Sequence, residues 1–180
     1  MHGSAMWWGK QFLKNYSIKG KILEVGSCKQ IKEFESQESG TTIYQEALRD
    51  QQPKDSEWIG ADISSGPGVD VVLKDPHKLP FSDGYFDASI SSSVYEHVLF
   101  PWELFKEQCR CVKVGGHIYI NAPSSGDYHP YPIDAWRFYR DASISFEKWA
   151  KQAGYPVFCH HASVDKNTHW NDFVCIFIRI

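Results

Sequence analysis

The sequence of 180 residues predicts a three-layer α/β fold with about seven strands, mostly parallel, and an antiparallel last strand. Strand-like apolar segments alternate with helical segments, which is typical of a parallel sheet with helices on both faces. A short polar stretch, 163–171, joins the last two strand-like segments, and it is long enough for an antiparallel return but not for a helical crossover. We expect a single domain over residues 1–180, because this length suits about one domain.

Each strand is expected where a short apolar run ends at a turn or at a polar residue. The first run ends at Gly26, and the second ends in an acid, Asp62. The stretch between these two runs is long enough to hold the helix that a parallel connection requires. The expected strands are residues 21–26, 57–62, 69–73, 86–91, 117–121, 157–162 and 172–179.

The expected helices begin at recognisable capping residues. Thr42 and Gln45 have the spacing of a capping box, which predicts a helix over 43–50 that ends before Pro53. Pro101 suits the first position of a helix whose apolar face extends to 112, and the glycine pair at 115–116 ends it. Asp141 is expected to cap a further helix that ends near residue 154.

Residues 1–20 form an N-terminal segment of helical character. Trp8, Phe12 and Tyr16 recur at helical spacing, which predicts one aromatic face. Such a helix either packs on the sheet or covers a cofactor as a lid, and packing is the favoured interpretation.

Composition and charge exclude several classes of protein. Hydrophobic and charged contents of 42% and 23% are ordinary for a globular chain and exclude disordered or collagen-like architectures. The net charge of −3 gives no overall attraction to nucleic acid or to an anionic membrane, and no apolar run approaches the roughly 20 residues of a membrane span. We therefore expect a small-molecule partner, with no nucleic acid and no membrane, while the oligomeric state stays open.

The cysteines indicate a reducing compartment. Their count of five is odd, without the repeated spacing of a disulfide framework, and the first residues show no secretory signal, so we expect a cytoplasmic protein. Cys159 precedes His160 and His161, but neighbours in a strand point to opposite faces. No metal site is expected.

Candidate binding residues follow the ends of successive strands, where open α/β sheets bind their ligands. Gly26 would let a ligand approach the backbone closely, and Asp62 suits hydrogen bonds from a ribose diol. Asp75 suits an exocyclic amine. Each residue has a plainer interpretation as well, because Asp62 could begin an Asx turn, Asp75 could open a turn before a proline, and Glu24 could cap a helix.

Five ordered motifs resemble those of class I S-adenosylmethionine-dependent methyltransferases, of the type often called the type 11 methyltransferase domain. A further segment, 128–139, resembles a motif that follows the fifth strand in one subgroup. The resemblance covers roughly residues 20–180, and it implies a Rossmann-like sandwich. The motifs are Ile22-Leu-Glu-Val-Gly-Ser27, Trp58-Ile-Gly-Ala-Asp-Ile63, Asp75-Pro-His-Lys-Leu-Pro-Phe-Ser-Asp83 with Phe86-Asp87, Val94-Tyr-Glu-His-Val98 and Val112-Lys-Val-Gly-Gly-His117.

The resemblance implies S-adenosylmethionine as cofactor and methyl transfer to a small-molecule or glycan-like acceptor. It places the methionine end at the first strand, the ribose and adenine at the second and third, and the sulfonium arm over the fourth. The implied cofactor-binding residues are Glu24, Gly26, Ser27, Asp62, Ile63, Asp75, Pro76, Ser91 and Ser92.

The first loop departs from the family pattern Gly-x-Gly-x-Gly, since Cys28 and Gln30 follow Gly26. A nicotinamide-dependent oxidoreductase needs three glycines so that pyrophosphate can lie on a helix N-terminus, and this chain has one of them. The altered loop also motivates a third hypothesis, a non-catalytic binding module that keeps the fold.

The acceptor is expected beyond the fifth strand, in the aromatic-rich loop that contains His129. An oxygen or nitrogen acceptor can require a base, and His129 and Asp134 are the candidate catalytic residues. Asp134 and Arg137 could instead pair with each other across a helical turn. The expected substrate-binding residues are Tyr95, His97, Tyr131, Trp136, Arg137 and Tyr139.

Overall fold

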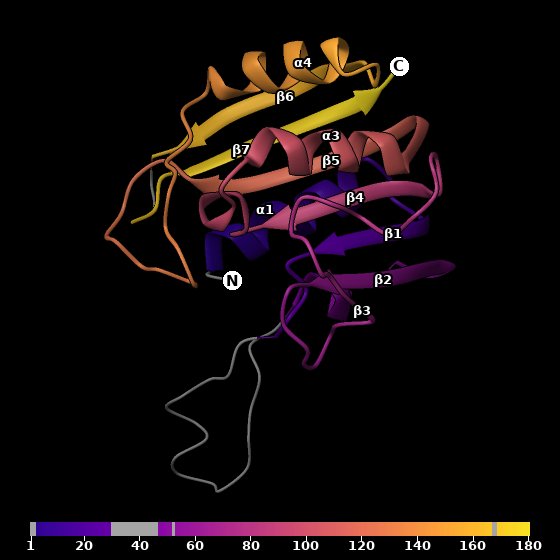
Figure 1. Cartoon of the computed structure of the whole chain (residues 1–180), viewed down its shortest axis with the longest axis horizontal. Coiled ribbons are helices and arrows are strands. Elements are labelled where there is room, and N and C mark those ends of the chain that lie inside the picture. Colours follow the sequence, from indigo (N-terminus) through magenta and orange to yellow (C-terminus); the bar gives the residue numbers. More distant parts are fainter. Residues whose placement is uncertain (1–2, 30–46, 52, 167–168) are drawn as a thin grey trace, which may run out of the picture.

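The computed structural model describes residues 3–29, 47–51, 53–166 and 169–180. Its centre is a seven-stranded sheet with strand order β3-β2-β1-β4-β5-β7-β6 (Figure 1). The strands are β1 (Gly20–Val25), β2 (Ser56–Asp62), β3 (Val71–Val72), β4 (Phe86–Ser92), β5 (Val112–Pro123), β6 (Val157–Asp165) and β7 (Asp172–Arg179).

The directions of the strands confirm the predicted fold class. β1 pairs in parallel with β2 and β4, and β5 continues the parallel sheet next to β4. β7 runs antiparallel to both β5 and β6, as the short connection between the last two strands predicts. The chain leaves β1 toward β2 and β3 and then returns to β4, so the order reverses between β1 and β4. Ligands of open α/β sheets bind at such a reversal.

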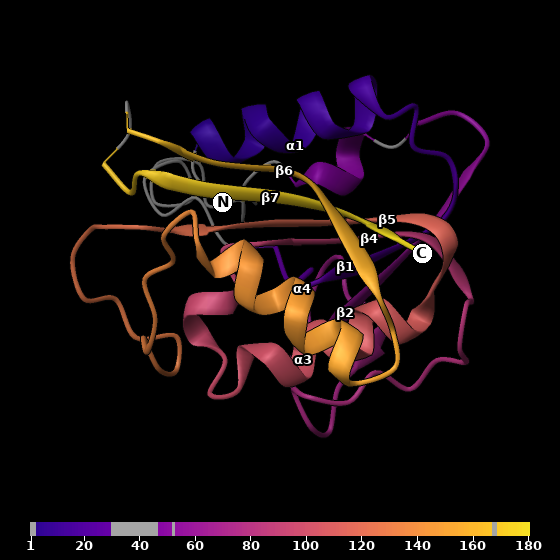
Figure 2. The same ribbon diagram turned by 90° about the horizontal axis from the view of Figure 1, so that it is seen from above.

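Helices cover both faces of the sheet (Figure 2). α1 (Gly3–Asn15) lies on one face, with Phe12 buried and its ring 4.9 Å from that of Tyr119. On the other face lie α3 (Pro101–Cys111) and α4 (Ala142–Gln152). The N-terminal segment thus packs on the sheet, the favoured one of its two interpretations.

The predicted element boundaries need three changes. β3 covers two residues rather than 69–73. Of the helix predicted over 43–50, residues 43–46 lie outside the described ranges, and Leu48–Gln51 form the 3-10 helix η1. α3 ends at Cys111, and β5 begins directly at Val112 instead of at residue 117.

A bulge explains why β5 begins early. Phe86 pairs with Val112, but Ala88 already pairs with His117, so β5 contains more residues than β4 over this stretch. Gly115 has φ +82°, and a Cβ on Gly116 would lie 2.7 Å from the Asp87 carbonyl oxygen. The glycine pair therefore shapes a bulge inside the strand, where a sequence pattern alone suggests the end of a helix.

No helix in the described part of the chain combines the length and the apolar character needed to cross a membrane.

The 3-10 helix η2 (Tyr95–His97) follows β4 and leads toward α3. It places its side chains next to the reversal point of the sheet, where the candidate site lies.

Candidate functional site

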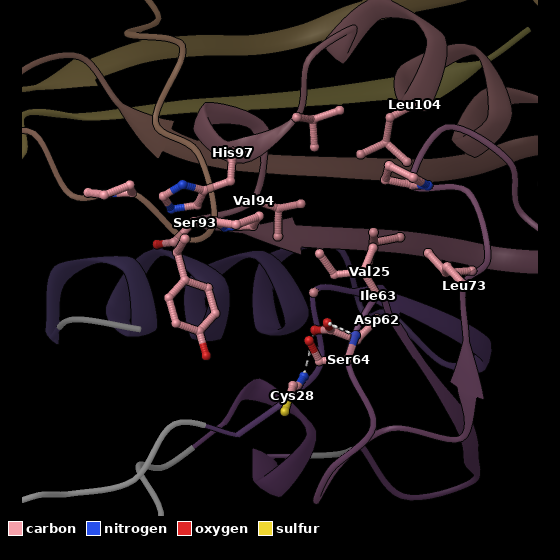
Figure 3. A pocket seen from close by; sticks show the side chains of 16 residues that line it. Val25, Cys28, Asp62, Ile63, Ser64, Leu73, Ser93, Val94, His97 and Leu104 are labelled. Atoms are coloured by element: carbon pink, nitrogen blue, oxygen red, sulfur yellow. Dashed lines mark hydrogen bonds between the residues drawn. The ribbon is translucent and has the colours of Figure 1, made fainter.

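A cavity of about 380 Å³ opens beyond the carboxyl ends of β1, β2 and β4 (Figure 3). Its size lies within the range of small-molecule sites, which is roughly 300–1,000 Å³. Most of its wall is apolar, with a few polar groups from the strand ends. The lining residues are Val25, Gly26, Cys28, Asp62, Ile63, Ser64, Leu73, Pro76, Ser93, Val94, His97, Val98, Leu104, Pro130, Tyr131 and Pro132.

Gly26 lines the cavity where β1 ends, as the sequence predicts. Its φ of +76° lies in the left-handed region that favours glycine. A Cβ at this position would lie 2.2 Å from Cγ2 of Val94, so no side chain fits without movement. The close approach at Gly26 is thus made by the chain's own segment after β4, and the two together form one wall.

Asp62 lies at the end of β2 with its carboxylate at the cavity (Figure 3). Its Oδ2 accepts a hydrogen bond from the backbone N–H of Cys28 at 3.0 Å, and its Oδ1 accepts one from the backbone N–H of Ser64 at 3.0 Å. The second bond is the Asx turn that the sequence allows. Each carboxylate oxygen accepts more than one hydrogen bond, so both retain capacity for a ligand hydroxyl.

Ile63 and Pro76 provide apolar surface beside this carboxylate. Ile63 is 46% exposed and lines the cavity, as expected of a residue that packs on a flat ring. Pro76 lines the cavity as well, but Asp75 before it does not. Oδ1 of Asp75 accepts a hydrogen bond from the backbone N–H of His77 at 2.9 Å. Nδ1 of the His77 ring lies 3.1 Å from the same oxygen. The backbone bond from His77 lowers the pKa of Asp75, whose carboxylate closes its own turn.

Glu24 belongs to the opposite side of β1. Its side chain is buried and accepts a hydrogen bond from Nε1 of Trp58 at 2.9 Å, and it does not line the cavity. Burial raises the pKa of Glu24 to about 7. Alternation explains this placement, because Val25 faces the cavity and its neighbour in the strand must face away.

The serines expected near the cofactor lie just outside the lining. The Ser27 hydroxyl is buried without a hydrogen-bond partner among the described residues. The Ser91 hydroxyl donates to the carbonyl of Tyr119 at 3.4 Å, and the Ser92 hydroxyl donates to Oδ1 of Asn121 at 3.2 Å. Both hydroxyls thus bond to β5, since these serines still belong to β4. The lining begins one residue later, at Ser93 and Val94.

Asp134 and Arg137 pair with each other, which was one of their two predicted interpretations. The Arg137 guanidinium donates to both carboxylate oxygens of Asp134, at 2.5 and 2.8 Å. This pairing holds the pKa of Asp134 well below its usual range, so the carboxylate is a weak base. Asp134 also accepts the backbone N–H of His129 at 2.9 Å, and it fixes the loop that carries this histidine.

The expected acceptor residues divide among three places. His97 and Tyr131 line the cavity. Trp136, Arg137 and Tyr139 instead line a second groove of about 820 Å³ beside α4. Tyr95 is fully buried and donates its hydroxyl hydrogen bond to Oε1 of Gln108, so it belongs to the core and has no surface for a ligand.

Sequence reasoning missed some residues that shape the site. Cys28 and Val94 line the cavity, but the sequence did not indicate them as binding residues. In the sequence, Cys28 is a departure from a glycine pattern and Val94 is the first residue of a motif. Glu96 is 1% exposed, and burial raises its pKa to about 8. Its one signal is its place next to His97, whose pKa burial lowers.

Comparison with known proteins agrees with this architecture. The family profile described as a methyltransferase domain matches residues 23–120, more than half of the chain. A protein of Mycobacterium sp. (strain KMS), named as an uncharacterized methyltransferase, is 36% identical over 69 residues, which are 33% of this chain and 27% of that protein. A Mycobacterium tuberculosis protein with the same description is 35% identical over 69 residues, 38% of this chain and 27% of that protein. The chain thus spans about a quarter of the length of these relatives.

Solved structures share the fold at low identity. An S-adenosylmethionine-dependent methyltransferase from Mesorhizobium loti superposes with a TM-score of 0.65 at 14% identity and covers 99% of both chains. A 1,6-didemethyltoxoflavin-N1-methyltransferase from Burkholderia thailandensis, solved with bound 1,6-didemethyltoxoflavin and S-adenosylhomocysteine, gives a TM-score of 0.62 at 10% identity, over 98% of this chain and 78% of that one.

The sheet order and the cavity at its reversal point define a Rossmann-like fold of the methyltransferase class. The chain belongs to the methyltransferase-domain family, among the class I S-adenosylmethionine-dependent methyltransferases.

Proposed function

We propose that the chain binds S-adenosylmethionine in the cavity and transfers its methyl group to a small-molecule or glycan-like acceptor. The observation that carries this proposal is the placement of Asp62 opposite Gly26 in one cavity, with hydrogen-bonding capacity left on both carboxylate oxygens. A vicinal ribose diol presents two hydroxyl donors at the spacing of one carboxylate, so the residues fit the adenosine end of this cofactor.

The neighbouring residues support the same orientation. The exposed side chain of Ile63 and the ring of Pro76 offer apolar contact to the adenine. Gly26 leaves room for the chain after β4, and Val94 from that segment lines the cavity beside it. The cofactor supplies an electrophilic methyl group on a positively charged sulfur. The largely apolar wall would limit the water around the reacting groups, which favours an in-line displacement.

The acceptor is expected between His97 and Tyr131, the two predicted substrate residues that line the cavity. Nε2 of His97 is unprotonated in the neutral ring, because Nδ1 lies 2.5 Å from the carbonyl oxygen of Ile133 and carries the proton. Arg137 holds Asp134 as an ion, so Asp134 supports His129 and is a poor proton acceptor itself. The aromatic residues of the second groove would contact only an extended acceptor.

Calorimetry with S-adenosylmethionine and with NAD tests this function. We expect micromolar binding of S-adenosylmethionine, weakened by roughly tenfold or more in Asp62→Ala. Asp83→Ala is the matched control, since Asp83 is exposed and its ion pair among the described residues is with Arg110. Saturable NAD binding would favour an oxidoreductase, and no binding of either ligand would favour a non-catalytic module.

A further inference from the structure

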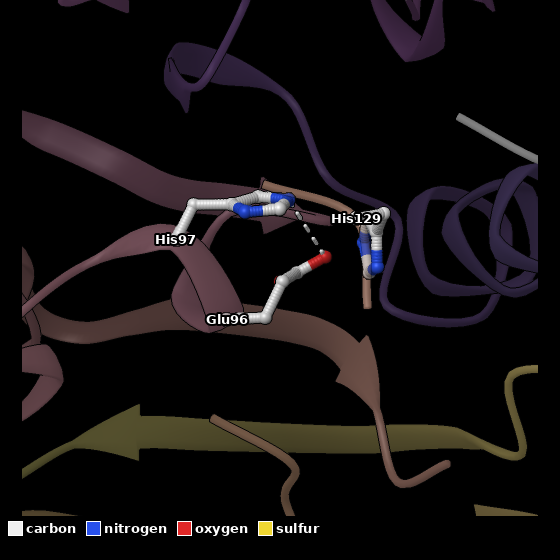
Figure 4. Close-up of side chains that lie close together, drawn as sticks. All are labelled: Glu96, His97 and His129. Atoms are coloured by element: carbon white, nitrogen blue, oxygen red, sulfur yellow. Dashed lines mark ion pairs between the residues drawn. The ribbon is translucent and has the colours of Figure 1, made fainter. Parts of the chain in front are cut away.

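Two histidines and a glutamate meet at the edge of the cavity. Glu96 and His97 come from η2, and His129 comes from the loop after β5 (Figure 4). They are the one group in the described part of the chain in which three such side chains bring a ligand atom each within 4.8 Å of one another. Neither the family nor the sequence pattern assigns these three residues a common role.

The hydrogen bonds of His97 leave a lone pair directed at the group. Nδ1 lies 2.5 Å from the carbonyl oxygen of Ile133, and a carbonyl only accepts, so Nδ1 carries the proton. Nε2 of the neutral ring is then unprotonated, and it lies 3.6 Å from Oε1 of Glu96. This separation is too long for a hydrogen bond, so the lone pair of Nε2 is directed at the carboxyl group without bonding to it.

His129 has the same kind of support. Its Nδ1 lies 2.9 Å from the carbonyl oxygen of Asp127 and 3.3 Å from Oδ2 of Asp134. These two acceptors assign the proton to Nδ1 and leave Nε2 as the ligand atom. Metal-binding histidines are held in this way, with one nitrogen donating to a carbonyl or carboxylate and the other free for the ion.

A structural role alone does not explain the cluster, because of the position of Glu96. Its side chain is 1% exposed, yet Oε2 has no hydrogen-bond partner among the described residues. A buried carboxyl oxygen without a partner loses its hydration and gains no hydrogen bond in return, which is costly. A cation between the carboxyl group and the two rings would take the place of the carboxyl proton and satisfy this oxygen.

We propose that Glu96, His97 and His129 bind one divalent first-row transition ion, for which Zn²⁺ is the reference. Two imidazoles and a carboxylate are an ordinary donor set for such an ion. Tetrahedral bonds of about 2.1 Å place donors roughly 3.4 Å apart, so the side chains close slightly around it. Three protein ligands leave a coordination position open, as in catalytic rather than structural sites.

The position of the ion gives it a use. His97 lines the cavity, so the open position lies beside the place proposed for the acceptor. An acceptor with a hydroxyl or carboxylate oxygen would coordinate there, which narrows the substrate class to oxygen ligands. This use rests on the proposed methyl transfer, whereas the binding of the ion does not.

Zinc binding is measured on the chain of 180 residues by competition with a chromophoric chelator, and the bound metal is counted by mass spectrometry. We expect one equivalent of Zn²⁺. We expect Glu96→Gln and His129→Asn each to raise the dissociation constant of Zn²⁺ by ~10-fold to 100-fold. His160→Asn is the matched control, because His160 is an exposed histidine on β6. We expect the Zn²⁺ affinity of this variant to equal that of the wild type. Absent binding, or equal affinity in the variants and the control, overturns the proposal.

Cobalt distinguishes this site from the cysteines, of which Cys28 also lines the cavity. Co²⁺ bound to nitrogen and oxygen shows visible ligand-field bands without the near-ultraviolet thiolate band, and that spectrum is expected. A thiolate band that persists in Glu96→Gln and His129→Asn places the metal on cysteine and overturns the proposal. Circular dichroism of each variant checks folding. Calorimetry with S-adenosylmethionine on the same samples separates failure of the cofactor proposal from failure of the metal proposal.

Discussion

Replacing Glu24 by glutamine should stabilise the protein, and more strongly as the pH rises. Glu24 is 5% exposed, and its carboxyl group accepts a hydrogen bond from Nε1 of Trp58 at 2.9 Å. A glutamine has nearly the same shape, and its Oε1 can accept the same bond. The substitution thus removes the buried charge and keeps the packing.

The magnitude follows from the pKa of Glu24, which burial raises from 4.5 to about 7. The native state then holds this proton more tightly than the unfolded chain, so between pH 4.5 and pH 7 it binds more protons. Stability therefore falls as the pH rises through this window. One pKa step is about 1.4 kcal/mol, so the full difference is about 3 kcal/mol above pH 7.

Urea unfolding of the wild type and of Glu24→Gln between pH 5 and pH 8 measures this effect. We expect similar stability near pH 5 and an advantage of up to about 3 kcal/mol for the variant at pH 8. Glu57→Gln on the neighbouring strand is the control, because the Glu57 side chain is 58% exposed. Parallel stability curves for wild type and Glu24→Gln would refute the reasoning that burial destabilises this carboxylate.

Two further substitutions test the packing around the site and the sheet. Gly26→Ala should cost about 1–2 kcal/mol for its left-handed φ, plus the clash with Val94. A Val94→Ala background should relieve the clash but not the conformational cost of the left-handed φ. If urea unfolding shows that Gly26→Ala lowers stability equally in the wild type and in Val94→Ala, this account is contradicted. Phe12→Ala should destabilise by about 3–5 kcal/mol, because its buried ring stacks on Tyr119. Trp7→Ala, at a 53% exposed position of the same helix, should cost about 0.5 kcal/mol or less, and a similar loss at both positions would show that α1 does not rest on the sheet through Phe12.

The order of strands and helices could be predicted from the sequence because it depends on local patterns. Apolar runs and turn residues mark each strand, and the short link over 163–171 allows only an antiparallel return. The early start of β5 could not be predicted this way. Its bulge depends on the pairing of Val112 with Phe86, two residues from different parts of the chain.

Part of the site also follows from the sequence. Gly26 and Asp62 end neighbouring parallel strands, and such ends must meet at one edge of the sheet. The direction of each side chain was harder to predict. Glu24 faces Trp58 and not the cavity, because alternation along a strand fixes its side chain opposite to that of Val25.

The sequence by itself determined the fold class and the edge of the sheet where the cavity opens, since both depend on short-range pattern and strand order. Only the tertiary structure decided which groups share that edge. Glu96 and His129 are far apart in the chain, and they meet because η2 and the loop held by Asp134 pack against each other. Contacts of this kind depend on how two loops fold back in space, which no periodicity in the sequence records.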